Sequence, residues 1–222
     1  MRFTNDSSRY GSVSQWLHWT TVALVIVLLV MGNAFEIETD EPGSAIFYWH
    51  SSLGVLVFVL AAARIGWLFF SRPPSLPRTT SRLFRVLARS THVALYALLF
   101  ALPISGWLAA SSEGAAVPFF GIATVPAWPE PARMAVAARE ANPSIPAGAS
   151  AQQARGNGEE EEGGFKELHE VLANALLILA SLHMLAALKH HFVDHDDVLR
   201  RMLPRSRRMG RTPAPAREHE LT

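Results

Sequence analysis

Histidines gather in one stretch of this chain. Five of the nine lie between residues 168 and 204. His169 and His183 are fourteen residues apart, almost four helical turns, so both rings leave one helix face roughly 21 Å apart along the axis. The residues between them on that face are small or aliphatic: Ala173, Leu176 and Ala180. Because imidazole binds metals and carries protons, this spacing indicates two linked sites at two depths.

The elements that must position these histidines are apolar. Residues 14–34, 47–70, 91–110 and 167–188 form stretches of about the ~20 residues that a helix needs to cross a bilayer. We therefore predict an all-α membrane protein, a four-helix transmembrane bundle, whose first partner is lipid and which has no nucleic-acid partner. A cleaved signal peptide is the alternative for the first stretch, but a signal peptide has no use for His18 between two tryptophans.

The chain has no cysteine. Disulfides, iron–sulfur clusters and covalent haem attachment are therefore excluded. Any haem in this protein must be held without a covalent bond to the chain.

The charges of the connectors predict the orientation. Arginines fill the connector between the second and third stretches and the tail after residue 189, whereas the first and third connectors carry most of the acids. By the positive-inside rule both termini are cytoplasmic. We thus expect a cytoplasmic N-terminus over 1–13, a four-span domain over 14–204 with a long external loop at 111–165, and a basic, disordered cytoplasmic tail over 205–222.

This orientation sorts four histidines by depth. His18 lies near the inner side of the first span and His50 near the outer side of the second, while His169 is outer and His183 inner. The matched pairs are His18 with His183 and His50 with His169. A haem between two helices needs one imidazole ligand from each, so the pattern predicts two bis-histidine haems, with these four residues as iron ligands. A proton pathway or transporter, and for any single histidine a role at the membrane interface, are the alternatives.

Three further residues lie near these pairs. Arg64 is fourteen residues after His50, hence on the same face at inner depth, where it could pair with a haem propionate or extend to the interface. Gly54, one turn beyond His50, could make room for a porphyrin or for another helix. His92, at the inner start of the third span, could serve a propionate, a quinone or the interface.

Four motifs of the chain resemble the bacterial cytochrome b561 group of di-haem membrane proteins. They are YGSVSQWLHW, WHSSLG…ARIGW, HVALYALLFALPISGW and LHEVLANALLILASLHMLAALKHHF…VLRRMLP, and they cover roughly residues 9–110 and 165–204. The fourth motif is the most specific of them. The resemblance places the four haem ligands of the family on the same histidines that depth and period select.

The resemblance implies transmembrane electron transfer through two non-covalent b-type haems that exchange electrons with quinone, in a bacterial inner membrane. Some relatives resemble superoxide oxidases, which take electrons from superoxide outside and reduce ubiquinone near the inner side; a histidine at the position of His190 belongs to their quinone site. Arg78 and Arg82 of the inner connector could assist there. The long loop at 111–165 departs from the compact pattern of the family, and its acids do not favour an anionic donor.

Three functions remain open at this point. The first is an autonomous quinone-linked oxidoreductase of the superoxide:ubiquinone type. The second is a haem-bearing anchor subunit that links a partner dehydrogenase or hydrogenase to the quinone pool, with a periplasmic redox partner. The third is a haem-free proton or metal transporter.

Overall fold

The computed structural model describes residues 3–6, 9–38, 44–74, 82–112, 115–128 and 159–203. Within these ranges the chain forms five helices and one hairpin: α1 (Ser12–Glu38), α2 (Ala45–Phe70), α3 (Arg82–Ser112), β1 (Val117–Phe119), β2 (Ala123–Val125), α6 (Glu159–Phe192) and α7 (Val198–Met202). The four long helices are each long and apolar enough to cross a membrane. The predicted all-α architecture with four long apolar helices, the candidate membrane spans, is thereby confirmed.

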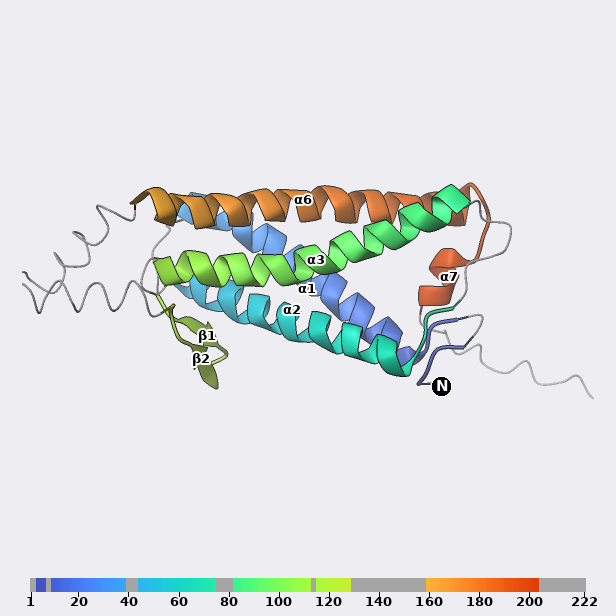
Figure 1. Ribbon diagram of the computed structural model, residues 1–222, viewed down its shortest axis with the longest axis horizontal. Coiled ribbons are helices and arrows are strands. Elements are labelled where there is room, and N and C mark those ends of the chain that lie inside the picture. The colour runs from blue at the N-terminus through green and yellow to red at the C-terminus, as the bar shows by residue number, and fades with distance from the viewer. Residues whose placement is uncertain are drawn as a thin grey trace, which may run out of the picture.

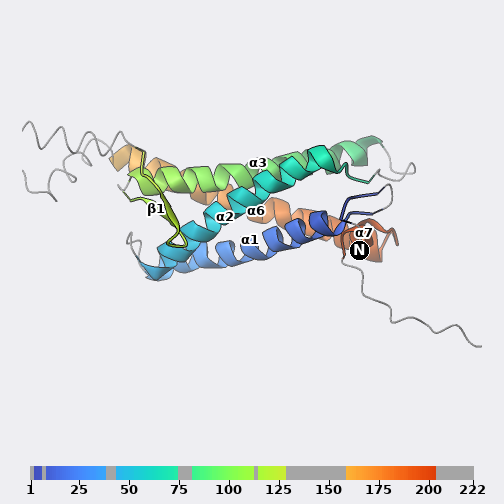
Figure 2. The same cartoon turned by 90° about the horizontal axis from the view of Figure 1, so that it is seen from below.

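The long helices run side by side, with α3 against α6, α2 against α3 and α1 against α2 (Figures 1 and 2). The β1–β2 hairpin lies at one end of the bundle and crosses the flank of α2 (Figure 2). The N-terminal segment and α7 lie at the opposite end (Figure 1). These two ends are called the hairpin end and the α7 end below.

Local sequence signals explain how α2 begins and ends. The Ser44 side chain accepts a hydrogen bond from the Phe47 N–H at 3.1 Å, which satisfies a free donor of the first turn. After Phe70 the chain becomes extended at Ser71 and meets Pro73 and Pro74, which disfavour a further helical turn. The beginning of α2 is thus explained by the Ser44 cap, and its end by the two prolines that follow.

The interior of the bundle is small. Its buried apolar cluster contains Val57 and Ala61 of α2, Leu99 of α3 and Leu176 of α6. Leu176 lies midway between His169 and His183, so the helix face that carries both histidines points inward. Apolar side chains on the other faces, such as Val93 and Ile178, are more than 60% exposed, as a lipid-facing surface requires.

All four long helices extend beyond the predicted apolar stretches, and α3 and α6 extend furthest. α3 begins at Arg82 rather than near residue 91, and α6 begins at Glu159 and so includes the run of glutamates. The physical reason is that arginine and glutamate are good helix formers, so a helix can continue into water past its apolar part. The hairpin lies inside the segment expected to be loop, while residues 129–158, Arg78 and the tail from 204 onward lie outside the described residues.

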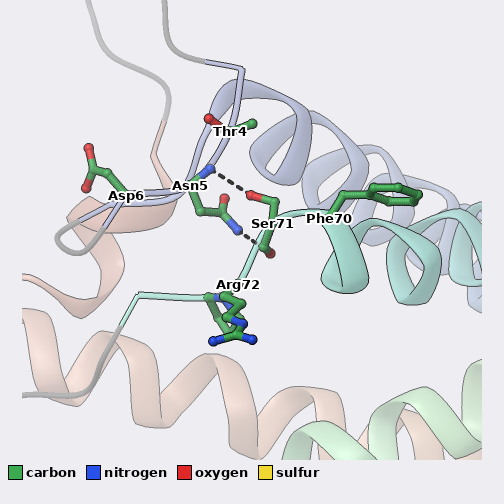
Figure 3. Close-up of a pocket in the computed structure, with 7 residues that line it drawn as sticks. Thr4, Asn5, Asp6, Phe70, Ser71 and Arg72 are labelled. Carbon is green, nitrogen blue, oxygen red and sulfur yellow. Dashed lines mark hydrogen bonds between the residues drawn. The ribbon is translucent and has the colours of Figure 1, made fainter.

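Hydrogen bonds between distant segments hold the α7 end together. The Asn5 backbone N–H donates to Ser71 Oγ at 2.8 Å and its side chain donates to the Ser71 carbonyl at 3.0 Å (Figure 3). Gln15 donates to the carbonyls of Tyr10, Arg201 and Leu203, and Trp19 Nε1 donates to the Met202 carbonyl at 2.9 Å. The N-terminal segment is therefore fastened to α2, and α7 to α1.

Candidate functional site

At the hairpin end, two predicted site residues face each other across the bundle. The rings of His50 on α2 and His169 on α6 have centroids 6.2 Å apart and planes inclined by 71°. A metal between two imidazoles needs a bond of about 2 Å to each ring plus half a ring on either side, which is close to this separation. The two side chains thus fit a single metal held between α2 and α6.

Helix α3 fixes the orientation of His169. Its Nδ1 atom lies 3.1 Å from the Leu102 carbonyl oxygen and 3.0 Å from Ser105 Oγ, while the Ser105 hydroxyl donates to the same carbonyl at 2.9 Å. A carbonyl oxygen can only accept, so Nδ1 carries the proton of the ring. The Nε2 lone pair is then available to a metal, as in metal sites where an oxygen holds the outer nitrogen of a ligating histidine.

Small residues give the two rings room. A Cβ atom on Gly106 would lie 3.1 Å from Cε1 of His169, so a side chain at this position would press against the imidazole ring. A Cβ on Gly54, one turn after His50, would meet no heavy atom within 4 Å. An added side chain at Gly54 would thus meet open space beside His50.

The hairpin is attached next to His50. Ser52, which is fully buried, donates to the Pro118 carbonyl at 3.0 Å and accepts from the Phe120 N–H at 3.2 Å. Trp49 packs edge-on against Phe120, and Trp107 of α3 donates to the Pro126 carbonyl at 2.9 Å. Segment 115–128 is therefore held by both α2 and α3 at the level of the His50–His169 pair.

A larger group of residues surrounds His18 at the α7 end. His183 of α6, His92 of α3 and Arg64 of α2 all lie near enough to act electrostatically on His18. The rings of His183 and His92 have centroids 5.1 Å apart at 84°. Nδ1 of His18 is buried and has no hydrogen-bond partner among the described residues. The structure thus brings His18 and His183 into one cluster, with His92 as a third imidazole beside them.

Arg64 places a positive charge in this cluster. Its guanidinium carbon lies 5.3 Å from the centroid of the Tyr96 ring, a cation–π contact. Among the described residues no ion pair joins Arg64 to a carboxylate. An arginine on a candidate membrane span without an acid beside it is suited to an anionic group of a bound molecule.

The comparisons with known proteins agree with this arrangement. The family described as prokaryotic cytochrome b561 matches residues 9–205. The chain belongs to the prokaryotic cytochrome b561 family. Cytochrome b561 homolog 2 of Escherichia coli is 33% identical over 213 residues, which cover 93% of this chain and 97% of that protein. A protein of Yersinia pestis named probable superoxide oxidase CybB is 28% identical over 202 residues, covering 90% of this chain and 98% of that protein.

Cytochrome b561 proteins generally bind b-type haem. The residues described above fit such a group: two facing imidazoles at the hairpin end, open space beside Gly54, and at the α7 end a guanidinium with no carboxylate partner in the described part of the chain. The resemblance noted from the four sequence motifs is confirmed at the level of the family.

His190 lies apart from both groups of histidines, in the last turn of α6. Its Nδ1 atom is 3.0 Å from Asp194 Oδ2 and 2.8 Å from Asp196 Oδ2. Sequence reasoning named His190 but not the two aspartates. It likewise missed Ser52, Ser105 and Gly106, although the last two lie in the quoted PISGW segment of the third motif.

Proposed function

We propose that this cytochrome b561 protein transfers electrons across the membrane through two b-type haems, with His50 and His169 as ligands of one and His18 and His183 as ligands of the other. The observation that carries the proposal is the 6.2 Å separation of the His50 and His169 rings, together with the second histidine cluster on the same face of α6. His169 and His183 are about 21 Å apart along that face, which divides the ~30 Å apolar core into short steps.

The protein's part is to hold and insulate the two groups. A bound haem supplies an iron that takes up and releases one electron at a time. Ser105 and the Leu102 carbonyl keep the proton of His169 on Nδ1, and Gly106 leaves space for the ring. At the other site Arg64 would neutralise a haem propionate, because it is the cation that lies beside both His18 and His183.

The proposed orientation puts the α7 end in the cytoplasm. The first turns of α3 carry Arg82, Arg85 and Arg89, α7 carries Arg200 and Arg201, and both lie at this end (Figure 1). The glutamates that begin α6 lie at the opposite end. This asymmetry supports cytoplasmic termini and an external hairpin in an inner membrane.

The proposed acceptor is ubiquinone at the α7 end, near His190, which makes the protein a quinone-linked oxidoreductase. Superoxide is the proposed donor at the hairpin end, on the strength of the name of the relative from Yersinia pestis. Glu170 acts electrostatically on His169, and such a negative charge slows the approach of an anion. We therefore expect superoxide oxidation to become faster at high ionic strength, where that repulsion is screened.

The first test is a dithionite-reduced minus oxidised spectrum of the purified protein, with haem counted by pyridine haemochrome. A b-type spectrum with two haems per chain supports the proposal. Folded protein without haem overturns it and favours the transporter. Reduction of ubiquinone by a superoxide-generating system then tests the donor, and failure of that reaction in the di-haem protein would favour an anchor subunit that works with a partner dehydrogenase.

A further inference from the structure

An open cavity lies at the α7 end, between the N-terminal segment and the end of α2 (Figure 3). Its volume of about 570 Å³ is in the range of pockets that take small ligands. The N-terminal segment lines it with Asn5 and Asp6, and the other side is lined by Phe70, Ser71 and Arg72. No histidine is among the described residues that line it, so the cavity is separate from both groups of histidines.

Asn5 builds one wall of this cavity. Its backbone N–H and its side-chain amide donate to Ser71 Oγ and to the Ser71 carbonyl. Its Oδ1 atom accepts from the Gly11 N–H and from Ser14 Oγ, both at 2.8 Å. Gly11 allows this arrangement, because a Cβ atom there would collide with the carbonyl oxygen of Phe3. Both polar atoms of the Asn5 side chain are thus used, and they hold the N-terminal segment in place beside the end of α2.

Two opposite charges line the cavity. Arg72 is exposed, and no carboxylate in the described part of the chain pairs with it. Asp6 is half-buried, and its Oδ1 atom accepts from the Arg9 N–H at 2.8 Å, which fixes the carboxylate in place. Figure 3 shows the side chains of Asp6 and Arg72 on either side of the bonds between Asn5 and Ser71. A ligand that spans the cavity therefore meets a cation at one end and an anion at the other.

The cavity lies where the apolar surface of α2 ends. The candidate membrane span of α2 ends at Phe70, and Phe69 and Phe70 are 83% and 84% exposed. Because contact of so much apolar surface with water is unfavourable, these two side chains are suited to lipid. A molecule in the cavity has this apolar surface on one side and polar groups on the other. That environment favours a lipid headgroup over a small soluble ion.

We propose that this cavity binds the headgroup of an amine-bearing phospholipid, with the phosphate at Arg72 and the ammonium at Asp6. A guanidinium matches the geometry of a phosphate, and a carboxylate accepts the hydrogen bonds that an ammonium donates. A headgroup with a phosphate but no cation places a second negative charge beside Asp6, and a trimethylated amine has no hydrogen to donate. The binding depends neither on haem nor on which side of the membrane the α7 end faces.

The test is a lipid titration of the purified full-length protein. Protein freed of bound lipid is titrated in detergent with dioleoyl phosphatidylethanolamine, with the phosphatidylglycerol of the same chains, or with dioleoylglycerol, and bound lipid is counted by native mass spectrometry. We expect phosphatidylethanolamine to bind most tightly and dioleoylglycerol least. Arg72→Gln should weaken the binding of both phospholipids about fivefold, the usual effect of one arginine near a lipid surface. Asp6→Asn, which keeps an acceptor for the Arg9 N–H, should remove the preference for phosphatidylethanolamine.

Arg200→Gln is the matched control. Arg200 lies at the same end on α7, its side chain is 68% exposed, and it is not among the residues that line the cavity, so this variant should bind lipid like the wild type. Equal binding by Arg72→Gln and Arg200→Gln would overturn the site, and so would wild-type protein that prefers phosphatidylglycerol. Displacement of the lipid by millimolar inorganic phosphate would overturn the lipid assignment in favour of a soluble anion. The haem content of every variant should equal that of the wild type, which keeps this test separate from that of the proposed function.

Discussion

The two groups of histidines are held in different ways. At the hairpin end, His169 is fixed by two oxygens of α3, Gly106 lies against its ring, and Ser52 fastens the hairpin beside His50. At the α7 end, the described contacts of His18 and His183 are electrostatic or edge-to-face with other rings, and they involve His92 and Arg64. Directional bonds fix the ring of His169 in one group, whereas ring contacts and the charge of Arg64 mark the other.

This difference indicates that the two sites depend on a ligand to different degrees. At the hairpin end the chain itself sets the separation of the two rings and the tautomer of His169, so binding of a haem would need little reorganisation there. At the α7 end a guanidinium lies near three imidazoles, and an anionic group such as a propionate would pair with that guanidinium. We therefore expect loss of a hydrogen bond to weaken the first site, and loss of the anion-binding arginine to weaken the second.

The largest predicted effect separates the two sites completely. His50→Ala or His169→Ala should remove the hairpin-end haem and spare the other, because each variant deletes one of the two residues proposed to hold that haem. His18→Ala or His183→Ala should do the reverse. Pyridine haemochrome and redox titration of each purified variant would measure this. His92→Ala, which changes the third imidazole of the α7 end, should keep both haems; equal loss of both haems in every variant would contradict the pairing.

A smaller effect is expected from removing the hydroxyl that holds the His169 ring in place. Ser105→Ala removes the hydroxyl next to His169 Nδ1 and should lower haem affinity at the hairpin end by about 10–100-fold, the usual effect of losing such a support. Haem retention during dilution, site by site, gives the measurement. Ser111→Ala is the control, because Ser111 is equally buried but its hydroxyl has no hydrogen-bond partner among the described residues. Equal behaviour of the two variants would argue against the support.

The apolar runs and the helical period of the sequence were enough to predict the helices of the bundle and one of their inward faces. The four spans and the inward face of α6 follow from them, since both properties reside in consecutive residues. The supports of the site could not be predicted in this way. Ser52 meets Pro118 across 66 residues, and Ser105 meets His169 across 64. No local sequence pattern identifies such pairs, because the sequence around a serine in a membrane span does not show whether its hydroxyl bonds to its own helix or to another one.

The glycines of α2 test whether a flat group lies beside His50. Neither Gly54 nor Gly66 would bring a new Cβ within 4 Å of a heavy atom, so the chain alone predicts that alanine stabilises either position by about 0.5–1 kcal/mol. If a porphyrin occupies the space at Gly54, Gly54→Ala should instead weaken the hairpin-end haem by about 1–3 kcal/mol through overpacking. Gly66→Ala is the control. Haem affinity unchanged in both variants would move the porphyrin away from Gly54.

The smallest effect concerns the cover of the hairpin-end site. Ser52→Ala breaks the bonds to the Pro118 carbonyl and the Phe120 N–H, and an unsatisfied buried group costs about 1–3 kcal/mol. We expect faster hydrogen exchange in residues 115–128. Ser51→Ala is the control, because within the described residues the Ser51 hydroxyl donates to carbonyls of its own helix, at Phe47 and Tyr48. If the hairpin also insulates the nearby haem, its potential should change in Ser52→Ala while that of the α7-end haem stays constant. Faster hydrogen exchange with both haem potentials unchanged would mean that the hairpin stabilises the fold but does not shield the haem. The difference between the two sites would then rest on Ser105 and Gly106.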